Sequence, residues 1–394
     1  MIAPMAPHVR SLPAAVPVAD VLPHAWVVGG AVRDLLLGAG ETVVDLDLVI
    51  EGDAVAAARQ LAAALGGPLV THEAFGTATV EAGGHVYDLA TARAESYAAP
   101  GALPDVRAGT IEEDLLRRDF TVNAIAVSFD GRVCAAPHAF EDLDARVLRV
   151  LHRRSFEDDP TRLLRLVRYA TRLGFGVEPS TAALADAAVA GGAFATVTPA
   201  RTGSELRLLL REPSAVEALA WVGSWEGALG LPLDVDRSLV ERALALLPDD
   251  GRADLLLLGS ACRAVAPAAL AGWLDALEFV GRERDVVVSV AQADGIEGGL
   301  SGASLPSEIA AVARGVPVEA MALAGALGAE TQARAWIDDL RGVSLAIDGA
   351  DLLAAGVPQG PALGRALAAA LAARLDGDAP DRDAQLAVAL AALG

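Results

Sequence analysis

The spacing of apolar and polar residues divides the chain at about residue 142. Before this point, short apolar or alternating runs between turn residues predict four strands, at residues 26–28, 43–50, 77–80 and 85–89. The last two strands are expected to form a hairpin around Gly83 and Gly84. An alanine-rich run at residues 54–65 predicts a helix that ends at Gly66. Beyond residue 142 the strand pattern fades and apolar residues recur at helical spacing.

These patterns together predict an α+β protein, with a small mixed-sheet head followed by an elongated, all-helical neck, body and tail. The composition agrees, since 53% of the residues are hydrophobic but only 4% are aromatic, and small aliphatic side chains favour packed helices over a β-sandwich. A chain of 394 residues is long enough for roughly two to three domains. We expect the head, neck, body and tail to occupy residues 1–140, 141–210, 211–300 and 301–394.

Charge is distributed unevenly along the chain. The formal net charge is −21, and all 31 basic residues are arginine, because the sequence contains no lysine. A chain this acidic is repelled by nucleic acid in bulk, which excludes a non-specific nucleic-acid coat and a polybasic membrane tether. Residues 142–172 nevertheless carry eight arginines and five acidic residues, a net charge of +3. We therefore expect any contact with nucleotides or RNA to be local and made by arginine.

The cysteines and the two ends of the chain exclude further classes. Cys134 and Cys262 are too few for a disulfide framework or a cysteine-rich zinc site. The first 23 residues lack the apolar core of a signal peptide, and arginines interrupt the alanine- and leucine-rich runs near the C-terminus. We therefore expect a cytoplasmic protein without membrane contact, and the sequence implies no protein partner.

Two aspartates stand out in the second predicted strand. Asp45 and Asp47 lie two positions apart, so their carboxylates share one face of the strand, roughly 7 Å apart along the chain. Leu46 and Leu48 point to the other face, toward the core. Two carboxylates held together repel each other and attract a cation, and oxygen ligands without nearby cysteine or histidine favour Mg²⁺. An isolated pair of this kind is more often a solvated strand end, so the neighbouring motif decides between the two interpretations.

A glycine pair lies between the first predicted strand and an apolar helical turn. Gly29 and Gly30 would let the backbone approach phosphate groups at the start of the helix, where Arg33 can offer a fork of donors to the same anion. A glycine pair alone is more often an ordinary turn. Followed by an arginine and then by the two aspartates on the next strand, it predicts a nucleoside-triphosphate site that uses metal ions.

Three segments in this order resemble the motifs of one enzyme family. They are residues 28–34 with the aspartate pair, residues 117–124 (RRDFTVNA) and residues 158–169 (DDPTRLLRLVRY). Through them the chain resembles the nucleotidyltransferase superfamily of DNA polymerase β type, and within it the class II CCA-adding enzymes and bacterial poly(A) polymerases. The resemblance covers about the first half of the chain well and continues weakly to its end.

The resemblance implies roles for the polar residues of the third motif. Asp159 and Arg162 would select CTP and ATP by presenting donor and acceptor groups to the base. Arg165 and Arg168 would then lie along the nucleotide and its triphosphate. Asp158 stands where many members of the family have glutamate.

The second motif and the sheet supply the remaining implied residues. Arg118 and Asp119 would contact the sugar and the phosphates, and Asn123 completes the polar set of that motif. Asp88 is implied as a third carboxylate, close to the primer hydroxyl. The expected catalytic residues are thus three aspartates, the first two of which also bind the metal: Asp45, Asp47 and Asp88.

The function implied by the resemblance is template-independent tRNA nucleotidyl transfer. With two Mg²⁺ ions, the enzyme would add CMP and AMP from CTP and ATP to the 3′ end of tRNA, completing CCA by in-line attack on the α-phosphorus. Residues 95–110 look like the family's flexible loop, which CC-only enzymes are thought to lack, so full CCA addition or A addition is favoured. An A-adding enzyme and a poly(A) polymerase remain alternatives, and a non-catalytic nucleotide-binding protein is a remote one.

Overall fold

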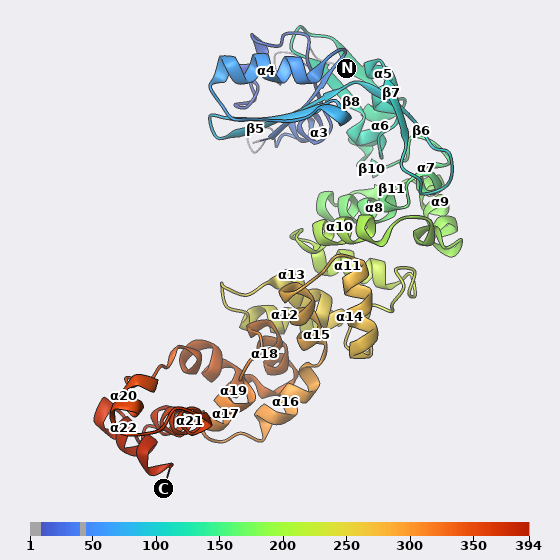
Figure 1. Ribbon diagram of the computed structural model, residues 1–394. Helices are drawn as coiled ribbons and strands as arrows, with labels where there is room; N and C mark the ends of the chain where they lie inside the picture. The colour runs from blue at the N-terminus through green and yellow to red at the C-terminus, as the bar shows by residue number, and fades with distance from the viewer. Residues whose placement is uncertain (1–8, 40–44, 394) are drawn as a thin grey trace. The chain divides into compact units, whose positions relative to one another are not determined.

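The computed structural model describes residues 9–39 and 45–393. It divides into two compact units, Met1–Thr198 and Pro199–Gly394, each with its own packed interior (Figure 1). The first two residues of the strand expected at 43–50 lie outside the described part. The finer division into head, neck, body and tail stays a prediction.

A seven-stranded mixed sheet forms the centre of the first unit. Its strands run in the order β3-β4-β5-β2-β1-β8-β9, and all neighbouring pairs are antiparallel except β2 and β5, which are parallel. The strands are β1 Trp26–Val28, β2 Asp45–Ile50, β3 Leu69–His72, β4 Thr77–Ala82, β5 His85–Thr91, β8 Ile125–Ser128 and β9 Val133–Ala135. The sheet includes the predicted β4–β5 hairpin, and with the helical remainder it confirms the α+β class.

Helix α4, Ala54–Leu65, packs against β4 and β5 and has the predicted bounds. Its start is capped by Asp53, whose carboxylate accepts a hydrogen bond from the Ala56 amide. Its end is Gly66, which has a φ of 72° that a residue with a side chain adopts only with strain. Strand β2 alternates as the sequence predicts, with Leu46 and Leu48 buried on the core side.

The segment expected as a flexible loop, residues 95–110, overlaps a second, two-stranded sheet, and residues 97–104 between its strands carry neither helix nor strand. Strands β6, Arg93–Ser96, and β7, Asp105–Ala108, pair antiparallel along their whole length. Helix α5, Ile111–Leu116, follows, and its first turn is closed by a capping box between Thr110 and Glu113. The hairpin and the helix therefore lead directly into the second motif.

Helix α8, Thr161–Leu173, carries the third motif. It begins after Pro160 and ends at Gly174, a residue in the left-handed region. Most of its apolar residues are buried, and so are Arg162 and Arg168. The other short elements of this unit are α2 Val16–Ala19, α3 Gly30–Leu36, α6 Ala139–Ala145, β10 Val147–Leu148, α7 Ser155–Asp158, β11 Gly176–Val177 and α9 Pro179–Ala190.

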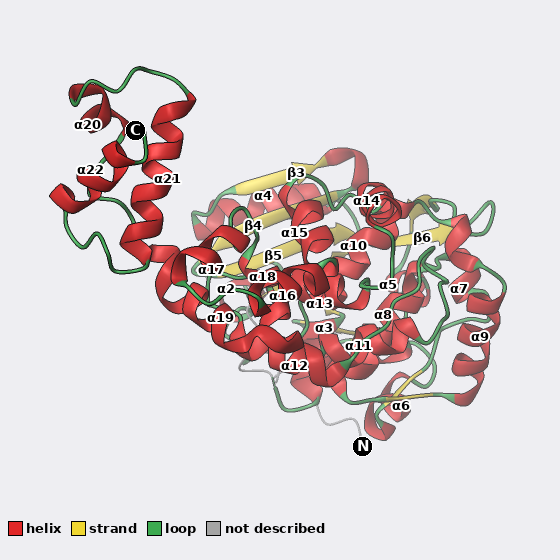
Figure 2. Cartoon of the chain, turned by 90° about the horizontal axis from the view of Figure 1, so that it is seen from below, coloured by secondary structure: helices red, strands yellow, loops and turns green. Residues whose placement is uncertain are grey.

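The described residues of the second unit form helices joined by loops, without a strand (Figure 2). Its helices are α10 Pro199–Leu210, α11 Ala215–Gly223, α12 Arg237–Leu246, α13 Ala253–Ala261, α14 Pro267–Ala276, α15 Arg282–Ala291, α16 Ala293–Ser301, α17 Pro306–Val312, α18 Val318–Ala324, α19 Glu330–Arg334, α20 Gly349–Ala354, α21 Pro361–Leu375 and α22 Arg382–Ala391. Helix α13 is buried along most of its length, and a Cβ at Gly259 would lie 2.5 Å from the Cβ of Val290 on α15. Only glycine allows these two helices to pack so closely. Among the described helices, none combines the length and the apolar character that crossing a membrane requires.

Candidate active site

Three aspartates meet on one face of the sheet. Asp45 and Asp47 project from alternate positions of β2, and the register of the parallel pair sets Asp88 of β5 directly beside Asp47. Cross-strand partners, and residues two positions apart on one strand, point to the same face of a sheet. The three carboxylates therefore lie on the same side, away from the buried leucines of β2. Asp88 is held by a hydrogen bond of 2.5 Å from the hydroxyl of Thr79 on β4. The strands thus bring together the residues that the sequence analysis singled out as catalytic, whose roles stay predictions.

The electrostatics of this face favour a cation. Desolvation raises the pKa of Asp47, Arg118 partly offsets this effect, and the negative charges of Asp88 and Asp45 raise the pKa further. No three histidine, cysteine or acidic side chains are already gathered as a metal-ligand set in residues 9–39 and 45–393. Mg²⁺ is commonly held by one or two carboxylates completed by waters and substrate phosphates. The pair Asp45 and Asp47 fits that mode of binding.

Gly29 allows an arginine to approach the aspartates. It lies between β1 and α3 with a φ of 69°, and a Cβ there would be 3.2 Å from Nη1 of Arg118 and 3.6 Å from Oδ2 of Asp47. Any side chain at this position would therefore be strained and would crowd Arg118. The first predicted motif thus makes room for a residue of the second. Gly30 opens α3 directly after this turn.

A buried aspartate, Asp114 of α5, holds the two arginines of the second motif. Its Oδ1 accepts hydrogen bonds from Nε and Nη2 of Arg117, at 3.0 and 2.7 Å, and its Oδ2 accepts one from Nη2 of Arg118 at 3.0 Å. The Asp114 side chain has no exposed surface. Sequence reasoning missed this residue, although an acid three and four positions before two arginines is the spacing of helical ion pairs.

The second motif is also bonded to the first. Arg33, which is buried, donates from Nη1 to Oδ1 of Asn123 at 2.7 Å and forms an ion pair with Asp34. The amide of Asn123 in turn donates to Oδ1 of Asp119 at 3.1 Å. Arg33 and Asn123 therefore join two motifs that lie 90 positions apart, and their contacts with a nucleotide stay predictions.

Tyr169 of α8 is the centre of an arginine cluster. The guanidinium carbons of four arginines lie 4.9 to 5.6 Å from its ring centroid: Arg33, Arg165, Arg168 and Arg172. Cation–π contact of this kind is favourable, and Phe120 packs its ring edge-to-face with the tyrosine. The sequence analysis named three of these arginines but gave no role to the tyrosine that collects them.

The two residues expected to read the base are both held at the start of α8. Oδ1 of Asp159 accepts hydrogen bonds from the amide and the hydroxyl of Thr161, at 3.1 and 2.7 Å. Arg162 donates from Nη1 to the hydroxyl of Ser155 and from Nη2 to the carbonyl of Arg117, each at 2.7 Å. Both side chains are therefore oriented by the protein itself.

The fold and the acidic site define the first unit as a nucleotidyltransferase head. Residues 25–149 match the model of the poly A polymerase head domain. A solved structure of a CCA-adding enzyme, in its apo form II, aligns with 95% of this chain and 93% of its own, with a TM-score of 0.80 and 28% identity. The family match of residues 25–149 and the alignment with a CCA-adding enzyme confirm the resemblance.

Two curated relatives carry different names. The A-adding tRNA nucleotidyltransferase of Halalkalibacterium halodurans is 44% identical over 218 residues, which are 53% of this chain and 51% of the relative. The CC-adding tRNA nucleotidyltransferase of Deinococcus radiodurans is 42% identical over 217 residues, 52% of this chain and 56% of the relative. The chain spans about half the length of the curated relatives it matches.

Proposed function

We propose that this chain is a tRNA nucleotidyltransferase that transfers CMP and AMP from CTP and ATP to the 3′ end of tRNA, completing CCA. The observation that carries the proposal is the position of Arg118 beside Asp47, on the face of the sheet where Asp88 is the cross-strand neighbour. A permanent cation and a cluster of acids then meet at one point, as the transfer of a phosphoryl group requires.

The reaction joins the 3′ oxygen of the tRNA to the α-phosphorus and releases pyrophosphate. Mg²⁺ held by Asp45 and Asp47 would supply the positive charge that stabilises the attacking and leaving oxygens. Arg118 would donate to phosphate oxygens, and its buried Nε has no hydrogen-bond partner within the described residues. Asp88, oriented by Thr79, would face the primer hydroxyl.

Selection of the base would rest on Asp159 and Arg162. Ser155 and the carbonyl of Arg117 fix two nitrogens of the Arg162 guanidinium, so its remaining N–H groups point in set directions. A rigid set of donors and acceptors distinguishes bases because a mismatched base leaves buried polar groups without partners.

An A-adding enzyme is the second candidate. The name of the Halalkalibacterium halodurans relative favours it, while the name of the Deinococcus radiodurans relative favours CC addition. A poly(A) polymerase would need a basic surface for unstructured RNA, whereas residues 376–383 carry four aspartates and one arginine. A binding protein without catalysis is disfavoured by the intact pair of Asp45 and Asp47.

One experiment separates these functions. Each labelled nucleoside triphosphate is supplied with tRNA that ends at the discriminator base, at the first C or at CC. Addition to all three tRNAs is expected for CCA synthesis, whereas addition to the last alone identifies an A-adding enzyme. Long A tails would identify a poly(A) polymerase, and no incorporation under any condition would refute nucleotidyl transfer.

A further inference from the structure

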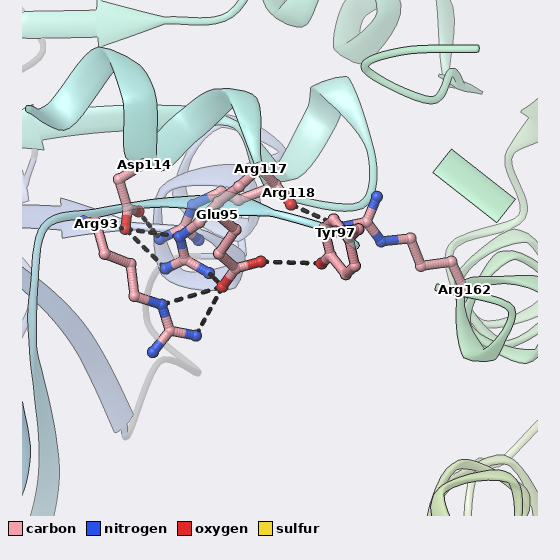
Figure 3. Close-up of polar contacts among 7 residues, drawn as sticks. All are labelled: Arg93, Glu95, Tyr97, Asp114, Arg117, Arg118 and Arg162. Carbon is pink, nitrogen blue, oxygen red and sulfur yellow. Dashed lines mark hydrogen bonds and ion pairs between the residues drawn. The ribbon is translucent and has the colours of Figure 1, made fainter. Parts of the chain in front are cut away.

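Glu95 of β6 is a buried acid outside the three motifs, and it connects the β6–β7 hairpin to them. Its Oε1 accepts hydrogen bonds from Nε of Arg93 and from Nη1 of Arg117, each at 3.1 Å (Figure 3). Its Oε2 accepts a hydrogen bond of 3.0 Å from the hydroxyl of Tyr97. Only 6% of the Glu95 side chain is exposed, so these charged hydrogen bonds lie in a largely dry environment, where they are strong.

Arg117 also contacts the third motif, and so connects Glu95 to it. While its guanidinium is held by Glu95 and Asp114, its backbone carbonyl accepts the 2.7 Å hydrogen bond from Nη2 of Arg162 (Figure 3). The position of that carbonyl depends on how the Arg117 side chain is anchored, because both belong to one residue at the end of α5. A continuous path of hydrogen bonds therefore runs from Glu95 to the arginine expected to read the base.

A cavity of about 350 Å³ lies beside this path. Among its lining residues are Tyr97 and Arg117 from one side and His152, Arg154 and Asp158 from the segment that precedes α8. Burial and the charge of Glu95 raise the pKa of Tyr97 to about 12, with Arg162 opposing the shift. Tyr97 thus stays protonated at neutral pH and remains a hydrogen-bond donor to Glu95.

We propose that Glu95 and Tyr97 are positioning residues for nucleotide selection, which hold Arg162 in the orientation that reads the base. The inference rests on the proposed function, in which Arg162 contacts the base. Neither residue needs to touch the nucleotide. Glu95 anchors Arg117, Tyr97 orients Glu95, and the Arg117 carbonyl fixes one edge of the Arg162 guanidinium, whose usefulness depends on its angle to the base.

The test measures equilibrium binding of ATP, CTP, GTP and UTP to the full chain without tRNA. Glu95→Gln keeps the shape of the side chain but removes its charge, and Tyr97→Phe removes only one hydroxyl. Glu178→Gln is the matched control, since Glu178 caps α9 and pairs with Arg149 in the same unit. Thermal unfolding of each variant reports the loss of stability separately.

We expect Glu95→Gln to reduce the preference for ATP and CTP over GTP and UTP by about tenfold, as small misplacements of a recognition group do. Tyr97→Phe should reduce it by about fivefold, the effect of one lost hydrogen bond. If Glu95→Gln does not fold, the result for Tyr97→Phe alone tests the positioning role. Glu178→Gln should lose stability and keep the wild-type preference.

If the Glu95 and Tyr97 variants bind all four nucleotides more weakly by the same factor, the proposal is overturned, because a purely structural role predicts that result. Equal binding of the four nucleotides by the wild type would also overturn it, since no selection would then exist to be positioned. The incorporation assay with tRNA decides the proposed function independently of either result.

Discussion

Arg165 donates two hydrogen bonds to one carboxylate oxygen of Asp119, from Nε at 2.9 Å and from Nη2 at 2.6 Å. The pair joins α8 to the segment after α5, across 46 positions of sequence. Asp119 is buried, which alone would raise its pKa, but Arg165 and the hydrogen bonds from Asn123 and the Phe120 amide lower the pKa below its ordinary value. The second and third motifs are thus fixed to each other by a buried ion pair.

The Asp119 pair makes stability depend on pH. We expect Asp119→Asn to lower the free energy of unfolding at pH 7 by about 3 kcal/mol, because Arg165 would lose its buried counter-charge. Since the pKa of Asp119 is lower in the folded than in the unfolded state, its stabilising effect is complete above the unfolded pKa and is lost as pH falls through the folded pKa. The difference between wild type and variant should therefore shrink below about pH 4. Urea unfolding at a series of pH values measures it.

Asp20→Asn provides the control for that series. Asp20 is an exposed aspartate, 3.6 Å from Arg10, and exposed pairs contribute little to stability. A difference between wild type and Asp119→Asn that stays constant down to pH 3 would show that the charge of Asp119 does not stabilise the fold.

The aspartates of β2 can be tested for catalysis directly. We expect Asp45→Asn and Asp47→Asn each to lower nucleotide incorporation on the order of a thousandfold, because charge stabilisation by a metal contributes several kcal/mol to such transfers. Binding of tRNA, measured by filter retention, should stay near the wild-type value. Glu81→Gln, an exposed acid on β4 of the same sheet, should leave both unchanged. Wild-type incorporation by both aspartate variants would rule out their assignment as metal ligands.

Asp159 allows base selection to be separated from folding. In Asp159→Asn the side-chain oxygen can still accept the hydrogen bond from the Thr161 amide, but an acceptor facing the base becomes a donor. We expect discrimination of CTP and ATP from UTP and GTP to fall by about tenfold or more, with little change in the unfolding temperature. Competition among the four nucleotides in single-addition assays gives the ratio. An unchanged ratio would remove Asp159 from base selection.

Gly29 and Gly38 form a natural pair for testing the approach of Arg118. Both have a positive φ, of 69° and 84°, so alanine at either position should be strained. A Cβ at Gly38 meets no atom within 4 Å, whereas a Cβ at Gly29 would press on Arg118. We therefore expect both variants to lose stability, while only Gly29→Ala raises the KM for nucleotides. Equal KM values in the two variants would contradict a role for Arg118 at the phosphates.

Local features of the fold were predictable from the sequence, while the contacts between distant segments were not. The bounds of α4 and the β4–β5 hairpin follow from glycine positions and apolar spacing, and the exposure of Asp45 and Asp47 follows from alternation along one strand. The pairing of Asp47 with Asp88 depends on the register of β2 and β5, which no local pattern encodes.

The residues that sequence reasoning missed are those whose role arises from tertiary packing. Tyr169, Asp114 and Glu95 each connect segments that lie apart in the sequence, or collect several arginines. Of the three, only Asp114 has a local signal, which is its helical spacing to Arg117 and Arg118. Within residues 95–110, the part between β6 and β7 contains Pro100 and Pro104 and is a loop as expected, while the pairing of its two ends as strands was not predicted.

The two oxygens of Asp114 serve different neighbours, Arg117 on one side and Arg118 on the other. One of these arginines supports Arg162 and the other lies beside Asp47. With the roles proposed for Arg118 and Arg162, a single substitution at position 114 is expected to alter both the rate of transfer and the choice of nucleotide.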